Sequence, residues 1–173
     1  MDNRYTYMRH PILLRFYSFV GLNYVKREAQ HGARGGHIDV TSGGSRFMPQ
    51  EQAILHALEA QVPADRITIS SDGNGSVPRF NAQGIVEGLS AAPVAGNLNL
   101  LPRLIDVGIP VPQAIAMLTA NVARSLGISG GVLCAGERAD ICVLNDDLSL
   151  AHLFAAGKPL LRDGECLVTG NFE

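Results

Sequence analysis

The order strand, helix, strand in the first half of the chain is the feature that most constrains its fold. GGHIDVTS (35–42) alternates apolar and polar residues, which is typical of a strand with one face in a core. EQAILHALEAQ (51–61) follows Pro49 and has apolar residues at helical spacing, and RITIS (66–70) predicts a second strand. Short connections in such a unit place the two strands parallel in one sheet. We therefore expect an α/β protein.

The second half of the chain divides into helices and a β-rich tail. LNLLPRLIDVG (98–108) and IPVPQAIAMLTANVARSLGI (109–128) predict two helices, the second ending at Gly127. The apolar stripe expected on that second helix is Ala114, Leu118, Val122 and Leu126. The residues between Ser76 and Gly96 contain Pro78 and several glycines and predict a loop. From residue 128 to 173, short β-type runs and the hairpin dipeptide Asp163-Gly164 predict a small β-segment.

Residues 1–34 differ from the rest of the chain in charge and aromatic content. They hold six Lys and Arg against two acids, whereas residues 35–173 hold eight against fourteen. All four tyrosines fall in this segment, and no A-x-A cleavage site follows its apolar stretch. We expect residues 1–34 to be an atypical, irregular segment, residues 35–127 to form the α/β part and residues 128–173 to form the β-segment.

Composition excludes several classes of protein. A net charge of −2 and a pI near 6.2 do not favour nucleic-acid binding. No uninterrupted apolar run reaches the length of a membrane span. The three cysteines are an odd number and have no C-x-x-C spacing, which fits a reducing compartment. We expect a cytoplasmic protein that binds neither nucleic acid nor membrane.

ITISSDGNGS (67–76) is the candidate site, because it places an aspartate just past the end of a strand. In parallel α/β folds the carboxyl ends of strands converge on one face, where chemistry is usually found. Asp72 could bind a divalent metal there and act as general base and then general acid. Gly73, Asn74 and Gly75 would let the backbone approach a substrate and present its N–H groups, and Ser76 adds a hydroxyl. The alternative is a tight turn, in which these residue types are common.

Other interpretations of this part of the chain are weaker. A calcium loop starting at Asp72 would need Gly at its sixth position and Glu at its twelfth, where Val77 and Gln83 stand. A phosphate-binding glycine loop would open a helix, which the residues after Ser76 do not predict. His37 and Asp39 share a strand face and could be metal ligands or a dyad, although a hydrogen-bonded structural histidine is commoner.

These motifs together resemble the isoaspartyl (β-aspartyl) dipeptidases of the amidohydrolase superfamily. GGHIDVTS and ITISSDGNGS resemble the last two barrel strands of those enzymes, and LTANVARSLGI is similar to the helix that leaves the barrel. The tail GERADICVLNDDLSLAHLFAAGKPLLRDGECLVTGNFE is similar to their C-terminal β-segment, so the resemblance covers roughly residues 27–173. SSDGNGS is the specific motif, whereas the tail marks only the superfamily.

The resemblance implies the C-terminal part of a (β/α)8 barrel, a binuclear zinc site and hydrolysis of β-aspartyl dipeptides. It implies that Asp72 binds metal and transfers the proton, that Ser76 and Gly75 contact the substrate, and that the complete enzyme is a homo-oligomer.

The family's other metal ligands, its histidines and carboxylated lysine, precede the region that matches. We therefore expect the C-terminal portion of such an enzyme, inactive alone. The alternatives are a non-catalytic remnant or an amidohydrolase acting on a cyclic amide, as dihydroorotases and hydantoinases do.

Overall fold

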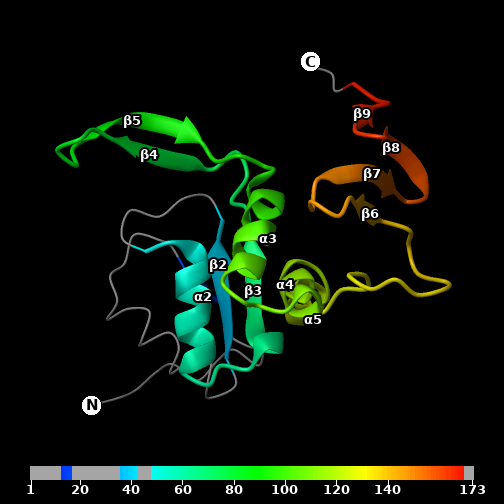
Figure 1. Ribbon diagram of the computed structural model, residues 1–173, viewed down its shortest axis with the longest axis horizontal. Helices are drawn as coiled ribbons and strands as arrows, with labels where there is room; N and C mark the ends of the chain where they lie inside the picture. Colours follow the sequence, from blue (N-terminus) through cyan, green and yellow to red (C-terminus); the bar gives the residue numbers. More distant parts are fainter. Residues whose placement is uncertain (1–12, 17–35, 43–47, 170–173) are drawn as a thin grey trace, which may run out of the picture.

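The first sheet of the protein is parallel and has three strands. The computed structural model describes residues 13–16, 36–42 and 48–169. The strands lie in the order β1 (Leu13–Phe16), β2 (His37–Thr41) and β3 (Ile67–Ser70). Between β2 and β3 the chain forms α2 (Gln50–Glu59) and the short 3-10 helix η1 (Ala64–Arg66). The predicted strand–helix–strand unit with parallel strands is confirmed (Figure 1).

Strand β1 corrects the expectation for the N-terminal segment. It lies within residues 1–34, which were expected to be irregular, and pairs in parallel with β2. The sheet therefore gains a third strand beside the two that were predicted. The rest of the segment, residues 1–12 and 17–34, lies outside the described residues.

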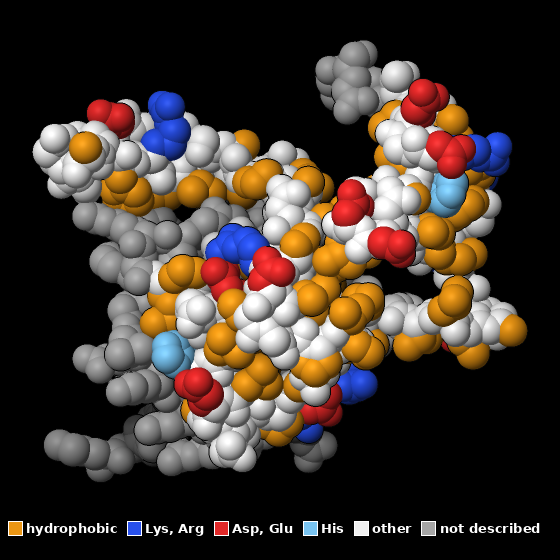
Figure 2. Space-filling model, viewed as in Figure 1, with side chains coloured by type: hydrophobic (Ala, Val, Ile, Leu, Met, Phe, Trp, Pro, Cys, Tyr) orange, Lys and Arg blue, Asp and Glu red, His pale blue; other side chains and the backbone are white. Residues whose placement is uncertain are grey.

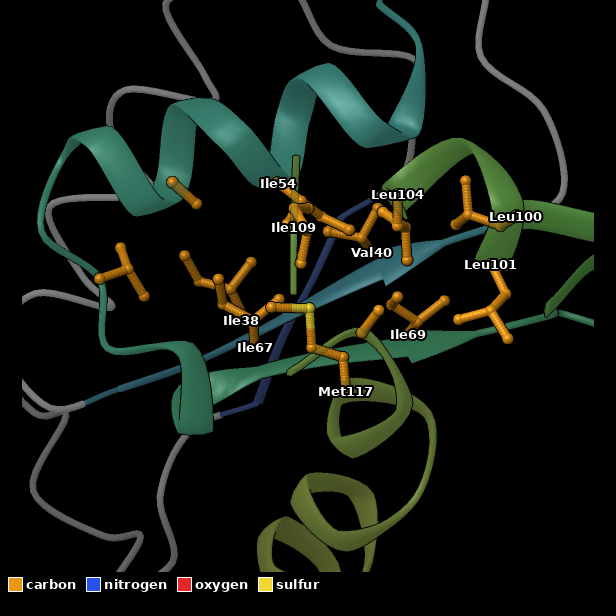
Figure 3. Close-up of a cluster of buried hydrophobic side chains, with 13 residues drawn as sticks. Ile38, Val40, Ile54, Ile67, Ile69, Leu100, Leu101, Leu104, Ile109 and Met117 are labelled. Carbon is orange, nitrogen blue, oxygen red and sulfur yellow. The ribbon is translucent and has the colours of Figure 1, made fainter. Parts of the chain in front are cut away.

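Both faces of β2 are buried, as in parallel sheets covered on two sides. Ile38 and Val40 face the helices and pack with Ile67 and Ile69 of β3. Their partners in the helices include Ile54, Leu100, Leu101, Leu104 and Met117 (Figure 3). The opposite face of the sheet carries polar residues, namely His37, Asp39, Thr41 and Thr68, all of them buried.

The segment after Ser76 is a β-hairpin rather than the predicted loop. It consists of β4 (Ser76–Phe80) and β5 (Val86–Ala91), which pair antiparallel. The Asn81 side chain closes the turn by accepting hydrogen bonds from the N–H groups of Gln83 and Ile85, at 3.0 and 2.9 Å. The hairpin extends away from the helices and carries exposed apolar side chains (Figures 1 and 2).

The helical region consists of α3 (Gly96–Asp106), α4 (Val111–Leu118) and α5 (Ala120–Leu126). One continuous helix was predicted where α4 and α5 lie, but Thr119 interrupts it with φ −132° and ψ −90°. Gly127 ends α5 in the left-handed conformation, as predicted. No helix in the described part of the chain has the length and apolar character needed to cross a bilayer.

The β-rich tail forms a separate antiparallel sheet, which confirms the predicted β-segment. Its strands are β6 (Ile141–Leu144), β7 (Leu150–Ala155), β8 (Lys158–Arg162) and β9 (Glu165–Cys166). Asp163 and Gly164 both have positive φ between β8 and β9, as the hairpin dipeptide predicts. Leu144 and Leu148 pack against the main core and join this sheet to the rest of the protein.

Candidate active site

The SSDGNGS segment begins at the carboxyl ends of two neighbouring parallel strands. The Ser42 N–H donates to the Ser70 carbonyl at 2.8 Å, which continues the pairing of β2 and β3 to their ends. Asp72 follows two residues after Ser70 and is half-buried. The predicted location of Asp72, just past the carboxyl end of a parallel strand, is confirmed.

The loop that carries Asp72 is tightly wound. Asp72 and Asn74 have φ of 51° and 62°, in the left-handed region that Asp and Asn tolerate better than most residues. The Gly75 N–H closes a turn by donating to the Asp72 carbonyl at 2.8 Å. A Cβ at Gly75 would lie 2.8 Å from that carbonyl oxygen and 3.1 Å from Oδ2 of Asp72. Glycine is needed at this position because a side chain there would collide with the Asp72 carbonyl and press against its carboxylate.

The N–H groups of this loop form hydrogen bonds within the protein. Gly73 N donates to Ser71 Oγ at 3.1 Å, and Asn74 N donates to the Ala92 carbonyl at 3.0 Å. The Ala92 N–H in turn donates to the Gly75 carbonyl at 2.8 Å. The sequence-based expectation that these N–H groups face a substrate therefore does not match the described loop. Their effect is to hold the loop against buried Ala92, just before α3.

Ser76, the other predicted site residue, is the first residue of β4. It pairs with Ala91 and is exposed. The roles of Ser76 and Gly75 in substrate binding, and of Asp72 in metal binding and catalysis, stay predictions.

Asp39 connects β2 to the strand that leads into the site. Its Oδ1 accepts a hydrogen bond from Thr68 Oγ1 at 2.8 Å, and its Oδ2 accepts one from Ser70 Oγ at 2.6 Å. The carboxylate therefore links the inner faces of β2 and β3 immediately before Asp72. Sequence reasoning missed Thr68 and Ser70, although their alternation with Asp72 along the strand was a usable signal.

His37 is the first residue of β2 and lies at the opposite end of the sheet from Asp72. Its Nε2 is 3.0 Å from a guanidinium nitrogen of Arg66, so its described contact is not with Asp39. Burial, and secondly the guanidinium of Arg66, lowers the pKa of His37 below its ordinary value. The predicted possibility of a His37–Asp39 dyad is not supported by these contacts.

The described residues do not fit a binuclear zinc site on their own. Among residues 13–16, 36–42 and 48–169, no group of three or more His, Cys, Asp and Glu side chains could hold a metal ion. Asp72 supplies one carboxylate, whereas zinc sites in proteins use three or four protein ligands. Zinc binding would need donors beyond this set.

Comparison with solved structures supports the barrel assignment. The β-aspartyl dipeptidase of Fervidobacterium islandicum AW-1 in complex with β-Asp-Leu superposes with a TM-score of 0.75 and 27% identity, covering 88% of this chain and 41% of that one. The N-acetylglucosamine-6-phosphate deacetylase of Thermotoga maritima superposes with a TM-score of 0.57 and 14% identity, covering 73% of this chain and 39% of that one, which shows a shared fold.

Comparison of sequences adds a different relative and the family. The adenine deaminase of Methanothrix thermoacetophila is 34% identical over 76 residues, which are 43% of this chain and 13% of the deaminase. The chain thus spans under half of the dipeptidase and a small part of the deaminase. The amidohydrolase family model matches residues 16–160. The predicted fold class, the C-terminal part of a metal-dependent-hydrolase (β/α)8 barrel with a small β-segment, is confirmed, and the chain belongs to the amidohydrolase family.

Proposed function

We propose that the chain is the C-terminal portion of a zinc-dependent β-aspartyl dipeptidase, with Asp72 as its proton-transferring carboxylate. The observation that supports this most is the likeness to the Fervidobacterium islandicum dipeptidase over 88% of the chain. The SSDGNGS loop at the end of β3 agrees with it, because it presents a carboxylate at the face where barrel enzymes carry their active sites.

The proposed chemistry of Asp72 is a two-way proton transfer. The carboxylate takes a proton from the water that attacks the carbonyl carbon of the β-linked amide. It then delivers that proton to the leaving nitrogen as the C–N bond breaks, which yields aspartate and the free amino acid. The exposed Ser76 hydroxyl donates a hydrogen bond to a carboxylate of the substrate.

Hydrolytic deamination of a purine is the second candidate. The identity of 34% to an adenine deaminase favours it, although this match covers only 43% of the chain. Both reactions add water to a trigonal carbon and expel nitrogen, so Asp72 could serve either. We prefer dipeptide hydrolysis as the proposed reaction because the match to the dipeptidase covers most of the chain with the same fold.

A chimera tests the proposal directly. This chain would replace the matching 41% of the Fervidobacterium islandicum dipeptidase, and release of leucine from β-Asp-Leu would be measured with zinc present. We expect activity in the chimera and its loss by at least about a thousandfold with Asp72→Asn, since a general base and acid together contribute on that order. Ser76→Ala should mainly raise KM, with Ser90→Ala as the control on the exposed β5 strand.

The same assay on the 173-residue chain alone should release no leucine, because the described residues contain no group of three or more side chains that could hold a metal ion. Conversion of adenine by the chimera without cleavage of β-Asp-Leu would favour the deaminase. A folded chimera whose dipeptidase activity is unaffected by Asp72→Asn would refute the role of Asp72.

A further inference from the structure

His37 and Arg66 make a polar contact at the end of the sheet that does not carry Asp72. His37 is the first residue of β2 and is 2% exposed, and Arg66 is the last residue of η1. Nε2 of His37 lies 3.0 Å from Nη1 of Arg66. A guanidinium can only donate hydrogen bonds, so Nε2 must be the acceptor and the ring proton is on Nδ1. The contact therefore requires a neutral imidazole.

The other ring nitrogen does nothing to offset the cost of protonation. Nδ1 of His37 is buried and has no hydrogen-bond partner among the described residues. Nδ1 already carries the proton of the neutral ring, so protonating the ring would turn Nε2 into a second donor. One donor would then point at a guanidinium, and the other would remain buried without an acceptor. Within the described part of the chain, neither nitrogen therefore has an acceptor that would stabilise the positive charge.

Among the described residues, the charged groups around His37 come from η1 and α5. Arg66 and Asp65 belong to η1, and Arg124 comes from α5, with its Nη1 3.5 Å from Oδ2 of Asp65. Asp65 is the acid in this set that favours a charged His37, but its carboxylate already pairs with Arg124. The balance of charge around the ring is therefore positive.

We propose that His37 and Arg66 form an acid-sensitive contact that holds η1 to the start of β2 at neutral pH and breaks on acidification. The inference is independent of the proposed function, because it concerns the opposite end of the strands from Asp72. Breaking the contact frees the Arg66 side chain and loosens the junction between η1 and the sheet.

The sign of the pH dependence follows from linkage. Burial first and Arg66 second lower the pKa of His37 in the folded chain below its ordinary 6.5. On acidification the unfolded chain therefore takes up the proton before the folded chain does. The stability that the neutral His37 contributes is fully present above its ordinary pKa. It is lost as the pH falls from there toward the lower pKa of His37 in the folded chain. Within that window each pH unit changes the folding equilibrium constant by up to about tenfold.

Urea unfolding of the full chain at pH 7.5, 6.5 and 5.5 tests this. We expect the wild-type midpoint to fall with pH, and His37→Gln to remove part of that fall because glutamine still accepts a hydrogen bond and does not titrate. His56→Gln is the matched control, since His56 is a more exposed histidine on α2 that pairs with Glu59 at 3.1 Å. This control should retain the wild-type pH dependence.

A second variant keeps the test decisive if His37→Gln does not fold. Arg66→Gln removes the neighbouring cation, and the His37 ring, followed by NMR, should then titrate at higher pH than in the wild type. An unchanged pH dependence in folded His37→Gln would overturn the inference. So would a wild-type His37 ring that titrates at or above its ordinary pKa, or one whose titration Arg66→Gln leaves unmoved.

Discussion

Replacing Asn121 by alanine should destabilise the protein, because this one side chain joins α5 to the start of β3. Asn121 is 2% exposed, and its Nδ2 donates to the carbonyls of Ala64 and Ile67, both at 2.9 Å. Each hydrogen bond contributes about 0.5–1.5 kcal/mol net, and losing the donor also takes a partner from the buried Ile67 carbonyl, whereas the Ala64 carbonyl still accepts from the Ile67 N–H. We expect Asn121→Ala to lower the free energy of unfolding by about 2–3 kcal/mol. That corresponds to a fall of about 4–12 °C in Tm for a chain of this length.

An aspartate at the same position separates the hydrogen bonds from the packing. Asn121→Asp keeps the shape but presents carboxylate oxygens to two carbonyl oxygens, so it should cost more than alanine at neutral pH, about 3–5 kcal/mol. Protonation would restore one donor. The stability of Asn121→Asp relative to Asn121→Ala should therefore rise as pH is lowered.

Urea unfolding followed by circular dichroism measures these free energies. Asn99→Ala is the control, because Asn99 lies exposed on α3 and its loss should change stability by less than about 0.5 kcal/mol. An Asn121→Ala variant as stable as Asn99→Ala would refute the reasoning.

Two glycine substitutions test close approaches of the backbone. Gly131→Ala would place a Cβ 2.7 Å from the carbonyl of Thr119, whereas a Cβ at Gly136 would meet nothing within 4 Å. Both glycines have positive φ, so the backbone strain of alanine is common to the two variants. Calorimetry should therefore show a loss of stability that is larger by about 1–3 kcal/mol for Gly131→Ala. Equal losses would contradict the clash. Gly75→Ala should displace the Asp72 carbonyl and carboxylate and lower kcat in the dipeptidase chimera, and unchanged kcat would contradict that contact.

The sequence predicted correctly those elements in which the apolar pattern and the residues that begin or end the element indicate the same structure. In α2, Ile54 and the following Val62 are buried as expected, and the Asp163-Gly164 hairpin forms where the dipeptide stands. Strand β1 was missed because an arginine interrupts its apolar run and the segment's unusual composition suggested irregular structure. Pairing with β2 outweighed that local signal.

Two further errors have specific causes. The β4–β5 hairpin was missed because Pro78 argues against a strand, but proline is tolerated in a two-stranded ribbon with open edges. Asn81, four residues before Ile85, was the available turn signal. On α4 and α5 the buried face runs through Ala114, Met117 and Asn121. Of the predicted stripe, Ala114 is therefore buried as expected, whereas Leu118 and Val122 are only half-buried and Leu126 is exposed. An apolar pattern could not select this face, because one of its members is a buried amide.

The location of the candidate site in the fold was predictable from the sequence, but the conformation of its loop was not. The end of β3 and the carboxylate of Asp72 follow from the sequence. The return of the chain at Ala92, which holds the loop, depends on a hairpin that was not foreseen. Without that hairpin, the N–H groups of the glycine-rich loop looked available for a substrate.

Asp72 is held from two directions, and this bears on which reaction the family member performs. From inside the sheet, Asp39 binds Ser70 just before the loop, and from outside, Ala92 binds Asn74 and Gly75 within it. Because the fold holds the loop that carries this carboxylate, the proposed proton transfer by Asp72 would suit amide hydrolysis and deamination alike. The substrate must then be selected by groups that differ between those reactions, and a dipeptide has carboxylates that a purine lacks. Substitution of Ser76, rather than of Asp72, is therefore the change that separates the two candidate functions.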